Sequence, residues 1–212
     1  MMKQPLGVIL AGGLATRMGG GDKGKLKLAG KSLLRHVIDR LEPQVAGLAL
    51  NANGDPTRFS DLNLPVIADS IEGFAGPLAG VLAGLDWAAD QGADCIVTAA
   101  ADTPFFPCDL VPQLLLATEG MEARLALVTT PRSGEELKSG GNKKINRHPT
   151  FGIWPVALRD DLRAALHDGL RKVVLWTDKH DGREALFPVG DIDPFFNVNT
   201  PADLEYAEAL IR

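Results

Sequence analysis

The stretch LGVILAGG, residues 6–13, decides the fold class of this 212-residue chain. A continuous apolar run that stops at paired glycines is typical of a strand buried on both faces of a parallel sheet. The rest of the chain alternates short apolar runs with segments of helical spacing. This order predicts one α/β domain over residues 1–212, with a mostly parallel, twisted, Rossmann-like sheet and helices on both faces.

The individual elements follow from periodicity and from turn residues. Helices are predicted over residues 31–44, 78–89, 110–117 and 156–167, and strands over 45–51, 65–68, 95–101, 125–130 and 195–199. The run Thr200-Pro201-Ala202-Asp203 predicts the start of a last helix that reaches about Ile211, because threonine at the N-cap, proline in the first turn and an acid at the third position favour helix initiation. Residues 170–176 are too short a run for periodicity to separate helix from strand.

The composition is that of an ordinary globular protein, and it excludes several classes of function. The formal net charge is −5, so the chain lacks the basic surface of a nucleic-acid-binding protein, and an anionic ligand must be held by a local group of cations. No apolar run approaches the ~18 residues of a membrane span, and the first residues do not resemble a signal peptide. Cys95 and Cys108 stand outside any metal or redox motif. We therefore expect a cytoplasmic protein without membrane or nucleic-acid partners.

A glycine-rich loop follows the first strand, over residues 10–23. It contains five glycines together with Arg17 and Lys23. Glycines allow backbone N–H groups to turn toward a polyphosphate, and the two cations add charge-assisted contacts. The loop therefore predicts a nucleoside triphosphate site, although its spacing is neither that of a P-loop nor that of a dinucleotide fingerprint. The alternative is a glycine-rich turn whose cations face solvent. The predicted contacts are Leu10, Ala11, Gly12, Gly13 and Lys23.

Polar side chains follow three of the predicted strands, at the edge where parallel sheets bind ligands. Asp102 comes directly after residues 95–101, and a carboxylate at this place can bind Mg²⁺ together with phosphate oxygens. Asp69 and Asn51 close two other strands, and the amide of Asn51 suits a base or ribose edge. Each has a plain structural alternative: a helix N-cap or a turn for Asp102, a cap for Asp69 and an Asx-turn for Asn51.

Two asparagines, Asn197 and Asn199, alternate along the predicted strand 195–199, so their side chains are expected on one face. Two amides on one face are costly to bury without partners, which predicts a face that is wet or lined by a ligand. The alternative is that one asparagine caps the final helix.

Residues 132–147 interrupt the alternation of strands and helices. They contain glycines, five cations and only two aliphatic residues, so they cannot build a core and are expected to form a mobile loop. The loop is either a surface excursion or a lid that docks an anionic substrate.

Five motifs occur in an order that resembles one enzyme family. They are Leu-Ala-Gly-Gly-x-x-x-Arg-Met-Gly-Gly with the following Asp-Lys, Gly76-Pro77-Leu78-Ala79-Gly80, Asp102-Thr103-Pro104, His148-Pro149-Thr150 and Asn197-Val198-Asn199-Thr200-Pro201. The loop alone resembles that of nucleotidyltransferases with a dinucleotide-binding-like fold. Together with the last motif it resembles the molybdenum cofactor guanylyltransferases (MobA family), and the resemblance covers nearly the whole chain.

The resemblance implies a single nucleotidyltransferase domain, with the nucleotide on about residues 1–104 and the acceptor on about residues 105–212. The implied reaction is transfer of GMP from GTP to the terminal phosphate of molybdopterin, with release of pyrophosphate and with Mg²⁺ as the cofactor. A monomer is expected, and molybdoenzyme-maturation proteins are possible further partners.

The resemblance also implies roles for particular residues. It assigns the metal to Asp102, and the nucleotide to the vicinity of Asn51 and Asp69. The pterin is expected near His148 and the pair Arg171 and Lys172, for which a solvated cation pair is the alternative. The implied catalytic residues are Arg17, Lys23, Asp102, Asn197 and Asn199.

Three other functions stay open. The first alternative is a CTP-dependent molybdopterin cytidylyltransferase or another small-molecule nucleotidyltransferase, because backbone N–H groups bind the phosphates and do not distinguish the bases. The second is a non-catalytic nucleotide-binding module. The third, a sugar-nucleotide pyrophosphorylase, usually has an extra C-terminal domain that does not fit in 212 residues. One departure from the family is the stretch 138–147, which is longer and more basic than its pattern and leaves open how the acceptor docks.

Overall fold

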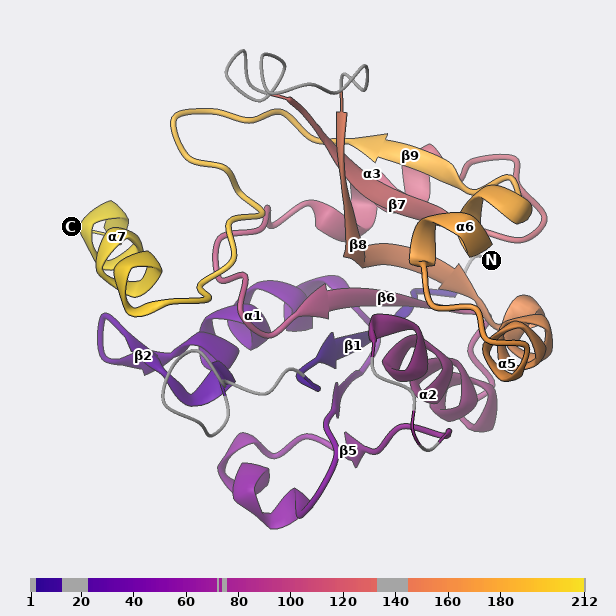
Figure 1. Cartoon of the computed structure of the whole chain (residues 1–212), viewed down its shortest axis with the longest axis horizontal. Coiled ribbons are helices and arrows are strands. Elements are labelled where there is room, and N and C mark those ends of the chain that lie inside the picture. Colours follow the sequence, from indigo (N-terminus) through magenta and orange to yellow (C-terminus); the bar gives the residue numbers. More distant parts are fainter. Residues whose placement is uncertain (1–2, 13–22, 72, 74–75, 133–144, 212) are drawn as a thin grey trace.

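A seven-stranded sheet forms the centre of the structure (Figure 1). The structure is a computed structural model and describes residues 3–12, 23–71, 73, 76–132 and 145–211. The order of the sheet is β5 (Val66–Ile67), β4 (Leu48–Asn51), β1 (Leu6–Leu10), β6 (Cys95–Ala100), β8 (Ile145–Pro155), β7 (Ala126–Pro131) and β9 (Arg183–Leu186). Among these described strands, β8 is antiparallel to both of its neighbours and the other six run in one direction. The predicted mostly parallel sheet is confirmed.

Helices cover both faces of the sheet, as predicted. One core joins the sheet to α1 (Leu33–Leu41) and α3 (Leu110–Ala117), and the other joins it to α2 (Pro77–Asp90), α5 (Arg159–His167) and α6 (Val173–Lys179). The alternation of side chains along β1 shows the division, because Val8 belongs to the second core and Ile9 to the first. Among the described helices, none combines the length and apolar character that crossing a membrane requires.

The last helix, α7 (Pro201–Ile211), packs on a small hairpin at one end of the sheet (Figure 1). The hairpin consists of β2 (Lys27–Leu28) and β3 (Lys31–Ser32), and its buried Leu28 contributes to a separate apolar cluster with Val198 and Ala207. The predicted helix start is confirmed, because the backbone N–H of Asp203 donates to Thr200 Oγ1 and the Asp203 carboxylate accepts the Thr200 N–H.

Short 3₁₀ turns complete the connections. They are η2 (Lys23–Lys25), η3 (Glu42–Gln44), η4 (Pro56–Leu62) and η5 (Val156–Leu158). The turn η3 ends the predicted helix 31–44, and η5 begins the predicted helix 156–167, so both predictions hold with shorter α-helical portions.

Two predictions about the second half of the chain are wrong. Residues 195–199 do not form a strand: the segment crosses the end of β6, where the Val198 N–H donates to the Asp102 carbonyl, and it pairs with no strand of the described structure. The expected mobile loop 132–147 includes the start of β8, which begins at Ile145 and pairs with β7. Residues 133–144 lie outside the described part of the chain.

The ambiguous stretch 170–176 contributes to helix α6. Its Val173 and Trp176 lie one turn apart on the buried side of that helix, so packing against the core outweighs the β-propensity of the valines. Strands β8 and β9 were not predicted, since the first half of β8 is polar and β9 has only four residues.

A buried hydrogen bond joins β6 to β8 beneath α6. Trp154 of β8 donates from Nε1 to Thr98 Oγ1 of β6 over 2.9 Å, and both side chains are inaccessible to solvent. The indole also stacks on Trp176 of α6, with ring centroids 6.2 Å apart. Trp154 therefore connects three elements of the second core.

Replacing Thr98 with valine is expected to lower the free energy of unfolding by about 1–3 kcal/mol, because the buried indole N–H loses its acceptor. Urea denaturation of Thr98→Val, Trp154→Phe and the double variant forms a double-mutant cycle. In the Trp154→Phe background the same threonine substitution should cost much less. Equal costs in both backgrounds contradict a role for this hydrogen bond.

Candidate functional site

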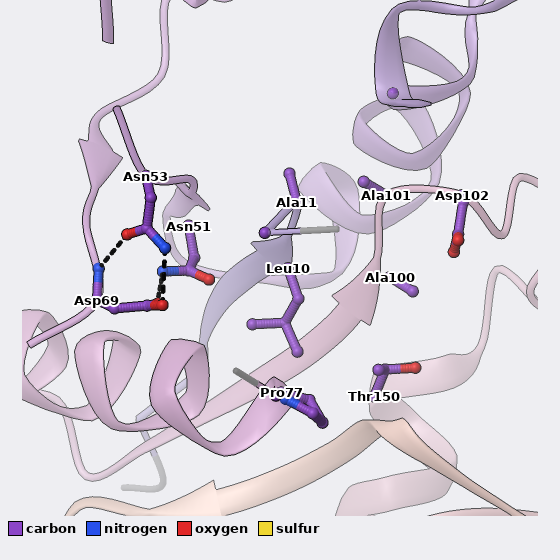
Figure 2. Close-up of a pocket in the computed structure, with 13 residues that line it drawn as sticks. Leu10, Ala11, Asn51, Asn53, Asp69, Pro77, Ala100, Ala101, Asp102 and Thr150 are labelled. Atoms are coloured by element: carbon purple, nitrogen blue, oxygen red, sulfur yellow. Dashed lines mark hydrogen bonds between the residues drawn. The ribbon is translucent and has the colours of Figure 1, made fainter. Parts of the chain in front are cut away.

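A cavity of ≈ 380 Å³ opens where β1, β4 and β6 end and where α2 begins (Figure 2). This is the edge at which parallel sheets bind ligands, and the size suits a small molecule. Gly12 of the glycine-rich loop lines it, and so does Gly24, the residue directly after that loop. Its lining consists of Leu10, Ala11, Gly12, Gly24, Asn51, Asn53, Asp69, Gly76, Pro77, Ala100, Ala101, Asp102 and Thr150.

One end of the cavity is a clamp of two amides around a carboxylate, which we call the amide clamp: Asn51, Asn53 and Asp69 (Figure 2). Asn51 Nδ2 donates to Asp69 Oδ1 over 2.9 Å, and Asn53 Nδ2 donates to Asp69 Oδ2 over 2.8 Å. The Asp69 backbone N–H donates in turn to Asn53 Oδ1 over 2.9 Å. The orientation of all three side chains is therefore fixed before any ligand binds.

Asn51 offers a ligand an acceptor and not a donor. Its Nδ2 donates to the Ile67 carbonyl as well as to Asp69, so both amide protons are used. The side chain is 3% exposed, and its Oδ1 lies against Gly80 of α2. A Cβ built at Gly80 would come within 2.2 Å of that oxygen, so the glycine provides space for Asn51.

The opposite end of the cavity holds Asp102, directly after β6 (Figure 2). The next residue, Thr103, is fully buried and donates from Oγ1 to Asn197 Oδ1 over 2.6 Å. The Val198 N–H donates to the Asp102 carbonyl over 2.8 Å. The C-terminal segment that carries Asn197 and Asn199 is thus attached to the end of β6.

A bulge in β8 brings Thr150 to the cavity. Val128 of β7 pairs with His148 of β8, but the neighbouring Leu127 pairs with Gly152. Residues 149–151 of β8 therefore have no paired residue on β7. Bulges redirect side chains in this way next to binding sites. Here Thr150 lines the cavity (Figure 2), while the adjacent Phe151 is buried in the first core.

His148, at the edge of the bulge, is held on two sides. Its Nε2 lies 2.9 Å from Thr130 Oγ1, and its ring lies against Phe195 with centroids 4.7 Å apart. Burial lowers the pKa of His148, against a smaller opposing effect of Asp193. The side chain therefore connects the β7–β8 hairpin to the segment that leads to Asn197.

Comparison with known proteins identifies the family. Residues 7–181 match the sequence model of the MobA-like NTP transferase domain. The chain belongs to this family. It is 49% identical over 207 residues to the molybdenum cofactor guanylyltransferase of Bradyrhizobium sp. (strain ORS 278), an alignment that covers 96% of this chain and 92% of the relative.

Solved structures of low sequence identity share the fold. The molybdopterin-guanine dinucleotide biosynthesis protein A of Archaeoglobus fulgidus superimposes with a TM-score of 0.69 at 22% identity, over 97% of this chain and 98% of that one. The CMP:2-keto-3-deoxy-manno-octonic acid synthetase, solved in complex with CTP, gives a TM-score of 0.71 at 18% identity, over 99% and 98%. The fold of the MobA-like family thus also occurs in a protein that binds CTP.

The structure brings most of the predicted site residues of this family member together. Six line the cavity: Leu10, Ala11, Gly12, Asn51, Asp69 and Asp102. Asn197 accepts from Thr103, the residue after Asp102, and Asn199 follows Val198, whose N–H donates to the Asp102 carbonyl; neither asparagine belongs to the cavity lining. Gly13 and Arg17 lie outside the described residues, and of Lys23 only the backbone in η2 is described.

Seven lining residues were absent from the predicted site: Gly24, Asn53, Gly76, Pro77, Ala100, Ala101 and Thr150. Asn53 follows Asn51 by two residues, a spacing that could have indicated a shared side of the strand end, and Gly24 directly follows Lys23. Thr150 belongs to a motif in the resemblance, but its position depends on the bulge, for which the sequence carries no signal.

Two arginines near the expected pterin region, Arg147 beside His148 and Arg171 itself, have partners in the structure. Arg147 forms ion pairs with Asp178 and Glu184, both at 2.9 Å. Desolvation lowers the pKa of Arg147, but the hydrogen bonds to these two carboxylates outweigh it, and the net pKa is raised. Arg171 donates to the carbonyls of Leu166 and Leu170 at the end of α5.

No set of three or more His, Cys, Asp or Glu side chains is arranged around a metal position in the described residues. Burial raises the pKa of Cys95 to about 11, which makes this thiol a poor nucleophile and a poor metal ligand at neutral pH.

Gly80→Ala is expected to weaken nucleoside triphosphate binding by about tenfold or more, because the added Cβ displaces Asn51 from the amide clamp and breaks its buried hydrogen bonds. Calorimetric titration with GTP and CTP measures the loss.

The matched control is Gly84→Ala, one turn further along α2. A Cβ there meets Val8 Cγ2 at 2.9 Å and Ile96 Cδ1 at 2.8 Å, so overpacking costs about 1–3 kcal/mol of stability without touching Asn51. If Gly80→Ala binds nucleotide as well as Gly84→Ala does, the clamp is not needed for binding.

The stability of the protein is expected to fall in acid partly through His148. The unfolded histidine takes up its proton near pH 6.5, whereas the buried one does so only at lower pH, so protonation favours unfolding as the pH falls below 6.5. Urea denaturation between pH 7.5 and 5 should show a smaller loss of stability for His148→Gln than for the wild type. Parallel pH curves contradict this.

Proposed function

We propose that this chain transfers the GMP group of GTP to the terminal phosphate of molybdopterin and releases pyrophosphate. One observation carries the proposal: Gly12 of the glycine-rich loop and Gly24, which directly follows that loop, line the same cavity as Asp69 and Asp102. A triphosphate there lies between a glycine-rich backbone and a carboxylate that can hold a cation. The choice of base and acceptor follows the names of the relatives from Bradyrhizobium and Archaeoglobus.

The two ends of the cavity suit different parts of the nucleotide. The amide clamp offers Asn51 Oδ1 as an acceptor for a base N–H or a ribose hydroxyl, and the Asp69 carboxylate disfavours a phosphate at this end. The phosphates are therefore proposed to lie toward Asp102, whose carboxylate can hold a cation against them, whereas both Asp69 oxygens are engaged in the clamp. Arg17 and Lys23, from the loop, are proposed to contact them there.

The chemistry needs positioning more than a base. A phosphate monoester is already anionic near neutral pH, so its oxygen can attack the α-phosphorus of GTP while the bond to pyrophosphate breaks on the opposite side. Arg17 and Lys23 offset the charge that develops on the leaving pyrophosphate. Asn197 and Asn199, on the segment that is attached to the end of β6, are proposed to contact the incoming phosphate.

The donor set fits Mg²⁺, which binds through one or two carboxylates and completes its shell with phosphate oxygens and water. Asp102 lines the cavity and is the proposed ligand, whereas both oxygens of Asp69 accept hydrogen bonds within the amide clamp. When bound, the ion supplies neutralisation of the phosphate charge.

The proposal includes a division of the chain, with the nucleotide on about residues 1–104 and the acceptor on about residues 105–212. Every residue of the amide clamp, and Asp102, belongs to the first part, whereas Thr150 and Asn197 belong to the second. We further propose a cytoplasmic monomer, which fits the two free thiols of Cys95 and Cys108.

Asp102→Ala is expected to lower the rate of pyrophosphate release from GTP and molybdopterin by ~10²-fold or more, because one charge-stabilising group is lost. Lys23→Ala should have an effect of similar size. Asp191→Ala, at an exposed site, is the control and should match the wild type. Near-normal turnover in a folded Asp102→Ala protein would remove the role assigned to that carboxylate.

The same assay separates the alternatives. Turnover with CTP in place of GTP identifies a cytidylyltransferase, an outcome that the fold permits, since the CTP-bound synthetase shares it. Binding of GTP with Mg²⁺ but no pyrophosphate release with any pterin phosphate identifies a non-catalytic module.

A further inference from the structure

Thr103 makes one short hydrogen bond, and it joins residues that lie 94 positions apart in the chain. The residue follows Asp102, is fully buried, and donates from Oγ1 to Asn197 Oδ1 over 2.6 Å. Asp102 Oδ1 lies 3.4 Å from the same hydroxyl, at the limit of a hydrogen bond. A threonine hydroxyl has one proton, so Asn197 receives it.

The backbone on either side of Asn197 is fixed independently. Val198 donates its N–H to the Asp102 carbonyl over 2.8 Å, and its side chain is fully buried in the cluster with Leu28 and Ala207. The Asn199 N–H donates to Asp203 Oδ2 over 2.9 Å at the start of α7. With the backbone held, the hydrogen bond from Thr103 selects which way the Asn197 carboxamide faces.

The carboxamide therefore has a defined polarity. Its Oδ1 faces the buried hydroxyl of Thr103, so its Nδ2 is the atom directed away from that contact, on a side chain that is exposed beside Asp102. Amide N–H groups bind anions, whereas Mg²⁺ binds oxygen ligands.

We propose that Thr103 is a positioning residue that makes Asn197 a hydrogen-bond donor to a phosphate group beside Asp102, and not an oxygen ligand of a metal ion. This inference rests on the proposed function, because it concerns a phosphate of that reaction. The phosphate belongs either to the triphosphate or to the acceptor, and both offer the same oxygens.

The first experiment compares Thr103→Val, which keeps the shape and removes the donor, with Thr103→Ser, which keeps the donor. Thr103→Val is expected to lower kcat/KM by about tenfold or more, the effect of one lost hydrogen bond to a charged group, and Thr103→Ser to restore most of it. A rise in KM for GTP assigns the bond to the triphosphate, and a rise in KM for the acceptor assigns it to the acceptor phosphate.

Two controls separate positioning from general damage. Thr118→Val removes another fully buried hydroxyl, which donates to the Leu114 carbonyl of α3 and lies outside the cavity lining. This variant should leave kcat/KM unchanged. Thermal unfolding should show Thr103→Val to be folded at the assay temperature. Equal kcat/KM for wild type, Thr103→Val and Thr103→Ser overturns the inference.

The second experiment uses Asn197→Asp, which still accepts from Thr103 but replaces the outward donor with a carboxylate oxygen. The inference expects turnover to fall by ~10²-fold, from repulsion of the phosphate, with no decrease in the Mg²⁺ concentration that gives half-maximal GTP binding in calorimetry. Retained turnover with half-saturation at lower Mg²⁺ identifies a metal ligand and overturns the inference.

Failure of the proposed function has a different signature. If the wild type transfers no nucleotide, the function fails, and the Thr103 variants are then compared by calorimetric binding of GTP, pyrophosphate and a pterin phosphate. Weaker binding of one of these to Thr103→Val than to Thr103→Ser supports the inference, and equal binding by all variants overturns it.

Discussion

Helix α2 lies directly on β1 and β4, and this close approach depends on residues without side chains. Gly84 sits against Val8 and Ile96, and Gly80 sits against Leu10 and Asn51. Because Gly80 leaves room, a polar amide can be buried between a helix and a sheet without losing its hydrogen bonds. The amide clamp and the wall of the cavity at the start of α2 both follow from this packing.

The two ends of the cavity are built on different principles. The amide clamp is assembled from residues that lie close in sequence and saturate one another, so its geometry belongs to the free protein. The Asp102 end is assembled from residues 94 positions apart, which meet through Thr103 and through the backbone of Val198. In the proposed function, the first end recognises a neutral part of the nucleotide, and the second gathers the groups that contact the charged phosphates.

The sequence predicts the first half of the fold well because each signal there is local. The run LGVILAGG and the helix after Gly76-Pro77 have the patterns of buried strand and helix start, and the structure has both. The residues after β1, β4, β5 and β6 were predicted as the site because strand ends in a parallel sheet meet at one edge. Of these, Ala11, Gly12, Asn51, Asp69 and Asp102 line the cavity, whereas Gly13 and Arg17 lie outside the described part of the chain.

The second half was harder to predict because its elements depend on distant partners. The start of β8 is polar, so its sequence predicts a loop. In the folded chain Arg147 forms ion pairs with Asp178 and Glu184, which are distant in sequence. Residues 195–199 alternate like a strand, but they cross the end of β6 and do not run beside a neighbour. Thr150 reaches the cavity through a bulge, a feature of pairing that no local pattern encodes.

The attachment of the C-terminal segment to β6 also bears on how the chain folds. The hydrogen bond between Thr103 and Asn197 joins residues 94 positions apart. Contacts that close so long a loop are expected to form late in folding, because the entropic cost of closing the loop comes before the stabilisation that the contacts give. During synthesis, β1, β4, β6 and the amide clamp are complete while Val198 has yet to be made. A nascent chain can therefore form the amide clamp well before Asn197 and Val198 join the Asp102 end of the cavity, so the two ends are expected to form in sequence order.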